Sequence, residues 1–392
     1  MPSSHSTPYR NFYLTLIAGF LGITIPTVTI NIIVDPYGIF KSPTQEGFNN
    51  IKTRQPKNTR LFKPIHASQI EYDTLLLGTS RVELGLKAES PGLGKTRKAY
   101  NLGTGAQTIH ESIAYANHAI TTNPNLKTII MGMDFWAFYL SQKSYEGFES
   151  YRLNRSGLHP WDALRYGFSV PSLWASLEVF QASGKHPKKH IFTDRGTMRF
   201  PWPIPNRSDS KWSQEWFKFF FRLVPNPNGV KSQHFDELQQ LVEVCKLKKI
   251  DLQLVITPPH TLNHRLIEKF LDVEDYENWK RQLVALGPVW DFSDVNSVTT
   301  EPVSVDMVNY DDISHYSQTV GDWILARVLA VSLPELPEDF GKRITLQNIE
   351  QHLVAVRSRY ATWKQNNPND LKQLDDYWTK SPFKNSAPKQ HN

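Results

Sequence analysis

Short apolar strands alternate with amphipathic helices from about residue 70 onward, and this alternation constrains the fold more than any other feature of the sequence. Strand patterns occupy 72–78, 98–103, 127–135 and 250–259, while apolar residues recur at helical spacing in the stretch 106–120. Strands separated by helices form parallel pairs, because a crossover helix returns the chain to the same edge of the sheet. The sequence therefore predicts the α/β class, with a mostly parallel sheet between two helical layers in a three-layer α/β/α arrangement.

The segment 11–34 contains no charged residue over 24 positions. At about 1.5 Å per residue, a helix of this length can cross the roughly 30 Å hydrocarbon core of a bilayer. Pro26 interrupts the segment, but membrane-spanning helices tolerate proline. Because no clear small-residue cleavage site follows, the segment predicts an uncleaved N-terminal transmembrane helix; a buried helix of a soluble domain is the alternative.

The charges beside this segment bear on its orientation. Only Arg10 and the amino terminus precede it, whereas five basic residues follow it within the next stretch of chain: Lys41, Lys52, Arg54, Lys57 and Arg60. By the positive-inside rule, this distribution favours a cytoplasmic position for the rest of the chain.

The overall composition excludes some classes of partner. The formal net charge is +6, but 38 acidic residues are interspersed among 44 basic ones, and no dense basic run indicates nucleic-acid binding. Cys245 is the single cysteine, so intramolecular disulfides and cysteine-based zinc sites are excluded. We expect no nucleic-acid partner, no metal and no cofactor; a mildly basic surface would suit an anionic glycan or a membrane face.

The chain divides into five predicted parts. These are an N-terminal tail (1–10), the anchor (11–34), a neck rich in turn-forming residues (35–69), the α/β domain (70–332), and a C-terminal helical segment with a polar tail (333–392). The strand–helix rhythm is lost over about 139–231, which we interpret as an aromatic-rich insertion. It is either a cap over the substrate or a packing subdomain without ligand contact. The last twelve residues, 381–392, are predicted to be disordered.

Polar and glycine-rich residues follow three of the predicted strands. Gly78-Thr79-Ser80-Arg81 follows the first strand, "NLGTGAQT" with Gly103 ends the second, and "GMDFW" with Asp134 ends the third. Ligands of open parallel sheets bind beyond the carboxyl ends of the strands, where glycine allows a backbone N–H to come close. Ser80 is therefore either a helix N-cap or a nucleophile.

A His–Asp pair lies far downstream in "NYDDISHYS", where Asp312 and His315 are three residues apart. This spacing puts both side chains on one side of a turn, where the carboxylate can hold the imidazole Nδ1–H and leave Nε2 as a base. Together with Ser80, the pair would form an activated nucleophile.

Two other motifs have weaker chemical interpretations. "SPGLGKT" at 90–96 lacks the first glycine of a phosphate-binding loop, because Glu89 occupies that position. His260 and His264 have the spacing of a zinc pair but lack the glutamate and further ligands of a zinc protease. The segment that holds them either borders the substrate cleft or is structural.

The motifs "LLLGTSR", "NLGTGAQ", "MGMDFW" and "DDISH", taken in this order, resemble the blocks of the SGNH hydrolase superfamily, the relatives of GDSL-type esterases. The resemblance covers roughly 70–135 and 235–330, and implies a flavodoxin-like α/β/α domain. It implies that Ser80 is the nucleophile, His315 the general base and Asp312 the residue that orients the histidine. It also implies that the N–H groups of Ser80 and Gly103 face the oxyanion.

Two positions depart from this family pattern. Thr79 replaces the aspartate that usually precedes the serine, and Asp134 stands where the third block carries an asparagine whose amide donates to the oxyanion. A carboxylate cannot donate a hydrogen bond, so either Asp134 holds the surrounding loops or the oxyanion hole is incomplete. Gly103, Asp134 and Arg81 are the candidate oxyanion and substrate-binding residues.

The anchor, the Gly-Thr-Ser block and the Asp-Phe-Trp sequence are similar to those of membrane-tethered bacterial proteins, such as alginate O-acetylation proteins and the D-alanyl transfer protein of teichoic acid synthesis. This similarity implies a single-pass inner-membrane protein that faces the periplasm and works with a multi-spanning membrane acyltransferase. It implies acyl transfer or ester hydrolysis on an acylated or anionic cell-surface polysaccharide. The alternative is a catalytically inactive glycan-binding or assembly protein of the same fold.

Overall fold

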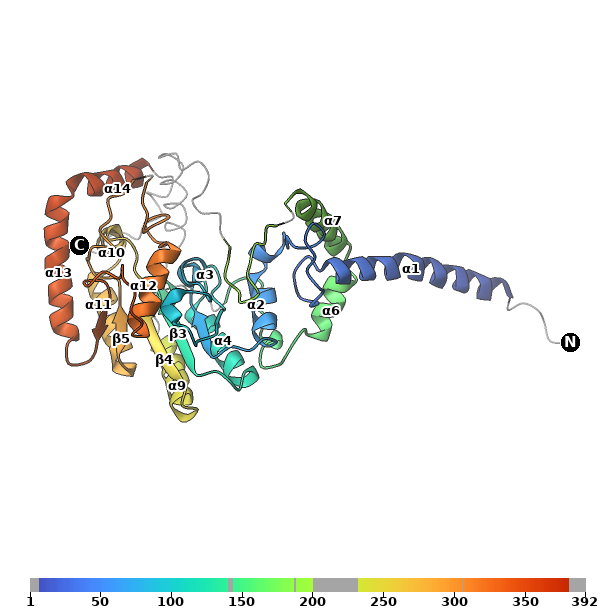
Figure 1. The fold of residues 1–392 in the computed structure, drawn as a ribbon, viewed down its shortest axis with the longest axis horizontal. Helices are drawn as coiled ribbons and strands as arrows, with labels where there is room; N and C mark the ends of the chain where they lie inside the picture. The colour runs from blue at the N-terminus through green and yellow to red at the C-terminus, as the bar shows by residue number, and fades with distance from the viewer. Residues whose placement is uncertain (1–6, 140–143, 187, 200–231, 305, 381–392) are drawn as a thin grey trace. The chain divides into compact units, whose positions relative to one another are not determined.

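The computed structural model describes residues 7–139, 144–186, 188–199, 232–304 and 306–380. The chain forms two compact units, of which the first comprises Met1–Gln69 with Ser156–Ile191 and the second Ile70–Arg155 with Phe192–Asn392 (Figure 1). Part of the predicted insertion therefore belongs to the same unit as the predicted anchor and neck. The predicted disordered tail 381–392 and much of the insertion, at 200–231, lie outside the described residues.

The second unit contains one six-stranded sheet with the order β2-β1-β3-β4-β5-β6. The first five strands are parallel, and β6 is antiparallel to β5. The strands are β1 (Thr74–Leu77), β2 (Ala99–Asn101), β3 (Thr128–Met133), β4 (Asp251–Ile256), β5 (Val289–Asp291) and β6 (Lys342–Ile344). The prediction of an α/β chain with a mostly parallel sheet is confirmed, and the four predicted strands correspond to β1–β4.

The central strands are apolar on both faces, as parallel strands between helices require. Every residue of β1 and β3 is buried. Their pairing aligns Leu75 with Ile129 and Leu77 with Met131, so both strands end at the same edge of the sheet. The segments that follow β1 and β3 therefore begin side by side.

Helices connect the strands and pack on the sheet, with α4 against β1 and α9 against β4. A capping box begins α4, in which the Thr108 hydroxyl accepts the Glu111 N–H and the Glu111 carboxylate accepts the Thr108 N–H. The helices of this unit are α3 (Ser80–Gly85), α4 (Ile109–Thr122), α5 (Phe135–Tyr139), α9 (Ser232–Leu247), α10 (Leu262–Phe270), α11 (Val273–Leu286), α12 (Gln318–Val328), α13 (Ile349–Asn366) and α14 (Pro368–Lys380).

Two hydrophobic clusters bring the distant motifs together. The larger one joins Val82 of α3, Ile130 of β3 and Tyr316, which follows the predicted base, to the apolar face of α12. The second cluster packs Trp136 of α5 and Ile313 against residues of α10, α13 and α14. Tyr310 and Tyr316, on either side of the "DDISH" motif, both lie in the larger cluster, and Ile313 within the motif lies in the second. Anchoring at these three positions fixes the turn.

A buried ionic network joins β5 to α11 and α13. Lys280 Nζ lies 2.7 Å from Asp291 Oδ2, and His352 Nε2 lies 2.9 Å from the same oxygen. Burial by itself disfavours both charges, but the close ion pair dominates, so the pKa of Lys280 is raised and the pKa of Asp291 is lowered. The network explains why the C-terminal helical segment is part of this unit rather than an appendage.

The first unit contains α1 (Thr7–Val34), α2 (Thr59–Ala67), α6 (Pro160–Gly167) and α7 (Val170–Lys185). Within α1, Tyr9–Val34 is long and apolar enough to cross a membrane, and most of it is exposed. The expected N-terminal apolar helix is therefore present, and it continues on both sides of Pro26. Both α6 and α7 contact α1.

Candidate active site

Ser80 is the first residue of α3, three positions after the end of β1. Thr79 is the N-cap, and its hydroxyl accepts the Arg81 N–H at 3.3 Å. The interpretation of Ser80 as the cap of this helix is therefore wrong, because the neighbouring threonine has that role. The Ser80 hydroxyl is half-buried and is left to interact with other groups.

The structure brings Ser80, His315 and Asp312 into one hydrogen-bonded chain. Ser80 Oγ lies 2.7 Å from His315 Nε2, and His315 Nδ1 lies 2.8 Å from Asp312 Oδ2. The other carboxylate oxygen accepts the N–H groups of Ser314 at 2.9 Å and His315 at 2.6 Å. Asp312 is buried, whereas the His315 side chain keeps 17% of its surface exposed. The expected contact among the three side chains is confirmed.

The turn that carries His315 is fixed by its two ends and by the segment after β4. Tyr310 and Tyr316 form an antiparallel bridge across it. The Tyr310 hydroxyl donates to the Pro258 carbonyl at 3.2 Å, and the His260 N–H donates to the Ile313 carbonyl at 2.9 Å. The segment after β4 therefore supports the turn through its backbone.

Asp134 follows β3 and is buried among three side-chain donors. Arg81 Nη1 donates to Asp134 Oδ1 at 2.8 Å. The Thr79 hydroxyl donates to Oδ2, and the Thr257 hydroxyl donates to Oδ1. The carboxylate thus joins the turn after β1 to the segment after β4, which supports the first of the two interpretations of this residue, that it holds the loops.

Arg81 extends this connection to the histidine turn. Its Nε donates to Ser314 Oγ at 3.0 Å, so one guanidinium bridges Asp134 and the residue before His315. The Arg81 side chain is only 6% exposed. The expectation that Arg81 binds substrate differs from this geometry, because its guanidinium is directed into the protein and paired there.

Gly103 lies after β2, and its N–H donates to Asn101 Oδ1 at 2.9 Å. An oxyanion could use this N–H only by displacing the asparagine, so the expected role of Gly103 is not what the structure presents. A Cβ at this position would lie 2.7 Å from the Glu83 backbone nitrogen. Glycine is needed here because the loop after β2 touches the backbone of α3.

The Ser80 N–H is the other backbone donor that was expected to face the oxyanion. Within the described part of the chain, no backbone or side-chain acceptor is hydrogen-bonded to it. The turn that presents it is held by Gly78, whose φ of +148° favours glycine and whose N–H donates to Gln107 Oε1 at 3.1 Å. A Cβ on Gly78 would lie 2.6 Å from a methyl group of Val82.

Four side chains that support the site were missed by sequence reasoning. Asn101 donates to the carbonyls of Val82 in α3 and of Leu86, its C-cap, at 2.9 and 2.7 Å, and thereby holds the helix and its end. Gln107, Thr257 and Ser314 contact Gly78, Asp134 and Arg81, as described above. Three of the four lie in the quoted motifs and Thr257 lies in the predicted strand 250–259, but a polar residue after a strand gives no signal of which partner it will meet.

His260 and His264 are structural in this geometry. Nε2 of His260 lies 2.7 Å from the Glu301 carbonyl, and Nε2 of His264 lies 3.1 Å from the Ser293 carbonyl. Burial lowers the pKa of both, that of His260 to about 4. Among the described residues, no group of three or more His, Cys, Asp or Glu side chains is arranged to hold a metal ion.

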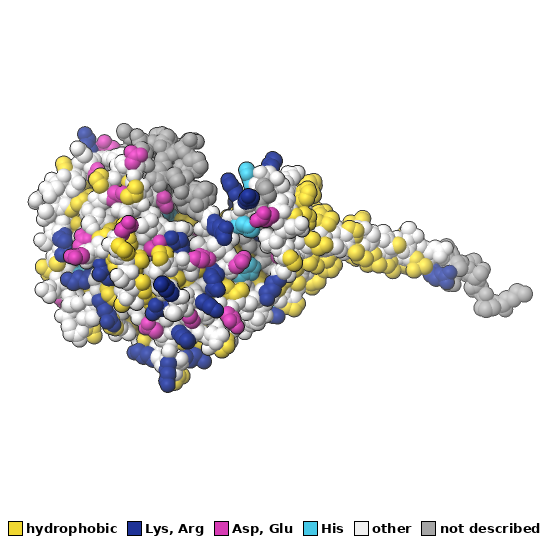
Figure 2. Space-filling model, in the orientation of Figure 1, with side chains coloured by type: hydrophobic (Ala, Val, Ile, Leu, Met, Phe, Trp, Pro, Cys, Tyr) yellow, Lys and Arg dark blue, Asp and Glu magenta, His cyan; other side chains and the backbone are white. Residues whose placement is uncertain are grey.

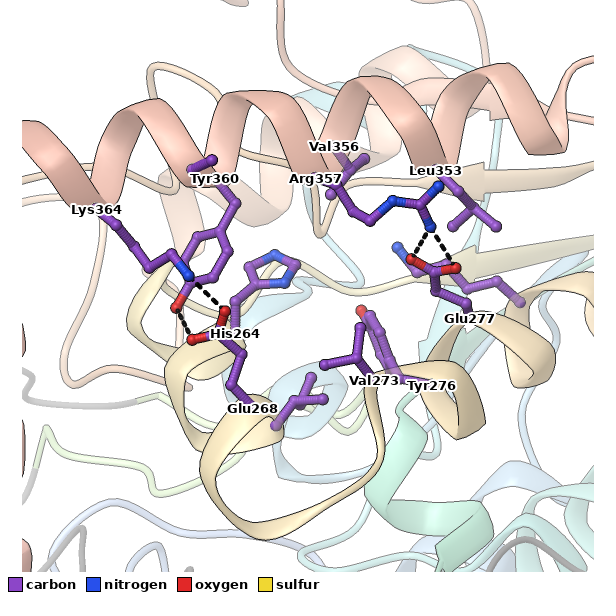
Figure 3. A pocket seen from close by; sticks show the side chains of 13 residues that line it. His264, Glu268, Val273, Tyr276, Glu277, Leu353, Val356, Arg357, Tyr360 and Lys364 are labelled. Atoms are coloured by element: carbon purple, nitrogen blue, oxygen red, sulfur yellow. Dashed lines mark hydrogen bonds and ion pairs between the residues drawn. The ribbon is translucent and has the colours of Figure 1, made fainter. Parts of the chain in front are cut away.

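A separate cavity of about 210 Å³ lies among α10, α11 and α13 (Figure 3). Val273, Tyr276 and Leu353 are among the side chains that line it. Two ion pairs flank it, Glu268 with Lys364 at 2.6 Å and Glu277 with Arg357 at 2.6 Å. None of its lining residues belongs to the Ser80–His315–Asp312 chain.

No protein-family model matches the sequence, and no curated protein matches it.

Proposed function

We propose that the chain is a membrane-anchored serine acyltransferase or esterase of the SGNH type, acting on an acylated cell-surface polysaccharide. The observation that carries the proposal is the continuous hydrogen-bonded chain from Ser80 Oγ through His315 to the buried Asp312 carboxylate. This arrangement suits acyl transfer, because the imidazole can take the serine proton while the carboxylate holds its tautomer.

In the proposed reaction, Ser80 Oγ attacks the acyl carbonyl carbon as its proton moves to His315 Nε2. The carbon–oxygen bond to the leaving alcohol then breaks, and that oxygen takes the proton from His315. The acyl group is left on Ser80. Water or a second hydroxyl group then gives its proton to His315 and attacks the carbonyl carbon of this ester. The bond between that carbon and Ser80 Oγ breaks, Ser80 Oγ takes the proton back from His315, and the acyl group passes to the acceptor. Water gives hydrolysis, and a sugar hydroxyl gives transfer.

Support for charge stabilisation comes from the Ser80 N–H, which has no hydrogen-bond acceptor among the described residues and can donate to the oxyanion. One donor of this kind changes the rate by about 10²–10³-fold. In the proposed roles, Asp134 and Arg81 are positioning residues, because they touch Thr79, Thr257 and Ser314 rather than the reacting atoms.

We propose that the second unit is a three-layer, flavodoxin-like domain. Its parallel strands have the order 2-1-3-4-5, which supports this arrangement. In such sheets the order of the strands reverses between β1 and β3, and ligands bind beyond their carboxyl ends. Ser80 and Asp134 follow these two strands, so the proposed chemistry lies where this class of sheet binds ligands.

We propose further that α1 anchors the chain in the bacterial inner membrane, with the second unit in the periplasm and a multi-spanning membrane acyltransferase as its partner. Charge counting favours the opposite orientation. One of the five counted cations is not a free surface charge, however, because Lys52 is buried and donates to the Val34 carbonyl at 2.7 Å. Burial, partly offset by Asp35, lowers its pKa.

The catalytic proposal is tested by labelling the purified full chain with a fluorophosphonate probe, which reacts with activated serines. We expect labelling of the wild type, loss of labelling in Ser80→Ala, and strong slowing in His315→Gln. The control Ser332→Ala, at an exposed serine, should label normally. A folded wild type that does not label, together with normal cellular function of Ser80→Ala, would favour the non-catalytic alternative.

The orientation is tested separately with reporters fused after Asn392. Alkaline phosphatase, which needs an oxidising compartment, should be active, and a reporter that works only in the cytoplasm should be silent. The reverse pattern would overturn the periplasmic assignment without bearing on the chemistry of Ser80.

A further inference from the structure

Helices α6 and α7 carry large apolar side chains on their outer faces. Trp161, Leu164 and Phe168 recur at helical spacing on α6 and just after it, and each is more than half exposed. On α7, Val170, Trp174 and Leu177 form a second stripe of the same kind, and Phe180 flanks it. We call these seven side chains the α6–α7 apolar face. Exposed aromatic side chains gathered on two adjacent helices indicate a surface that is covered in the working protein.

The α6–α7 apolar face lies in the same compact unit as α1 and is fastened to its last turns. Asn31 of α1 is fully buried, and its Nδ2 donates to the carbonyls of Gly167 at 2.9 Å and Ser169 at 3.0 Å. Ser176 of α7 donates back to Asn31 Oδ1 at 3.2 Å. Figure 1 shows α6 and α7 flanking this end of α1. The connection between α6 and α7 is therefore held beside the last turn of α1.

The last turns of α1 reach the surface of a bilayer when the helix spans it. The apolar span Tyr9–Val34 has 26 residues, or about 39 Å at 1.5 Å per residue, against a hydrocarbon core of roughly 30 Å. The surplus places the last turns of α1 at the boundary between acyl chains and headgroups. Ile32 and Ile33 remain exposed there, so apolar surface continues from α1 to the α6–α7 apolar face (Figure 2).

The chemistry of this unit fits the same surface. Tryptophan is enriched where membranes meet water, because one part of its ring system is apolar and its N–H is polar. The first unit contains eleven Lys and Arg residues but four acids, so it carries a formal charge of +7, whereas the second unit carries −1. Two of the four acids, Asp35 and Asp162, and two of the eleven bases, Lys52 and Lys63, are buried. The exposed Arg165, Lys185, Lys188 and Lys189 can meet anionic headgroups.

We propose that the α6–α7 apolar face docks into the headgroup–acyl boundary of the same bilayer that α1 spans, so that the first unit is a monotopic platform as well as an anchor. The inference rests on the membrane-anchoring part of the proposed function and is independent of the chemistry at Ser80. The platform would restrain the neck at the membrane surface, because Asn49 holds it to α1 and Asn50 holds it to the segment after α7. Part of the insertion, interpreted from the sequence as either a cap or a packing subdomain, is thereby assigned to lipid contact.

The test places an environment-sensitive fluorophore on single introduced cysteines in the full chain, reconstituted into vesicles of neutral and anionic phospholipids. The native Cys245 is 1% exposed, and burial raises its thiol pKa to about 11, so it competes poorly for the label. Trp161→Cys and Leu177→Cys probe the α6–α7 apolar face, and Ile23→Cys probes α1. Leu247→Cys, on a leucine of α9 that is 83% exposed, is the matched control in water.

We expect the labels at 161 and 177 to lose about half of their fluorescence to lipids with a nitroxide near the headgroup, since docked helices lie 5–10 Å deep. Both labels should resist iodide in water, whereas the label at 247 should respond only to iodide. Labels at 161 and 177 that behave like 247, while the label at 23 is quenched by lipids with a nitroxide near the end of the acyl chain, would overturn the platform but leave the anchor intact. Protection of 161 and 177 from both quenchers would show that protein rather than lipid covers the face, and would overturn the platform. Residue 23 lies near the middle of the span, so no quenching there by the acyl-chain nitroxide would overturn the anchor and the platform together, without affecting labelling of Ser80.

Discussion

Replacing Asp134 by asparagine separates the two accounts of this residue. In one account, the site needs an amide at this position to donate to the oxyanion, and the carboxylate weakens it. In the other, the carboxylate holds the site together by accepting from Thr79, Thr257 and Arg81. Asparagine has nearly the same shape as aspartate, so the substitution changes charge and hydrogen bonding with little change in volume.

The structure predicts a loss of stability from this change. The Asp134 and Arg81 side chains are 3% and 6% exposed, and Asp134 Oδ1 lies 2.8 Å from Arg81 Nη1. Asparagine at position 134 therefore leaves a buried guanidinium without its counter-charge. Breaking a buried pair from one side costs about 3–5 kcal/mol of unfolding free energy, or about 6–10 °C in melting temperature for a unit of this size. The double variant Asp134→Asn/Arg81→Met removes both charges and should recover part of that loss.

The same substitution should also slow the chemistry. Arg81 connects Asp134 to Ser314, the residue before His315. When asparagine no longer holds the Arg81 side chain in place, the contact between Ser80 and His315 is disturbed. A displacement of about 1 Å costs on the order of 100-fold in rate. We therefore expect Asp134→Asn to react about 100-fold more slowly with a fluorophosphonate, measured on the purified full chain alongside its thermal unfolding.

The reasoning would be refuted by an Asp134→Asn variant that unfolds at the wild-type temperature and reacts faster than wild type. A gained oxyanion donor should raise the rate by about 10²–10³-fold, so the two accounts predict changes of opposite sign. Asp236→Asn, the same change at an exposed position of α9, is the control and should alter neither quantity.

Three further predictions test the supporting structure. Gly103→Ala puts a Cβ 2.7 Å from the Glu83 backbone nitrogen, whereas in Gly105→Ala the closest atom to the new Cβ is a side-chain oxygen 3.6 Å away. Thermal melts should show that Gly103→Ala loses about 1–3 kcal/mol of unfolding free energy and that Gly105→Ala does not. Lys280→Met leaves Asp291 buried without its cation, so urea unfolding should show a loss of about 3–5 kcal/mol. Burial lowers the pKa of His260 from 6.5 to about 4 in the folded protein. As the pH falls from 6.5 to 4, the unfolded chain therefore binds a proton at this histidine before the folded chain does. Acidification over this range lowers the free energy of unfolding by up to about 3 kcal/mol through this group. Urea midpoints at pH 7 and pH 4.5 should therefore differ less in His260→Gln than in the wild type.

The parallel sheet could be predicted from the sequence because its central strands are continuous apolar runs. "TLLL" and "TIIMGM" are buried on both faces, and a run of this kind between turn-forming residues has few other interpretations. The strands β5 and β6 were missed because the three residues of each, "VWD" and "KRI", include charged residues and form no apolar run. Their place in the sheet depends on tertiary contacts, such as the Lys280–Asp291 pair, that no local pattern reports.

The contact of Ser80 with the His315–Asp312 pair could also be predicted, because parallel topology brings the residues that follow neighbouring strands to one edge of the sheet. The partners of Asp134 could not, since a carboxylate after a strand can face either the substrate or the protein. The choice depends on Thr257 and Arg81, which reach it from separate loops. Sequence order indicated where the polar residues would gather, whereas only side-chain packing shows which of them face one another.

The departure at Asp134 and the hydrogen bond at Gly103 have a common consequence. Gly103 was expected to face the oxyanion, and Asp134 was expected either to hold the loops or to leave the oxyanion hole incomplete. In the structure both help to hold the turn that carries Ser80, Asp134 through its side chain and Gly103 through its N–H to Asn101. In the proposed mechanism, these polar groups fix the nucleophile and the base before substrate arrives, and the Ser80 N–H would stabilise the developing charge. In such an arrangement, a change at Asp134 acts through the position of Ser80 and His315 rather than through direct contact with the oxyanion. The sign of the Asp134→Asn effect on labelling rate is thus the measurement that most directly tests how this site works.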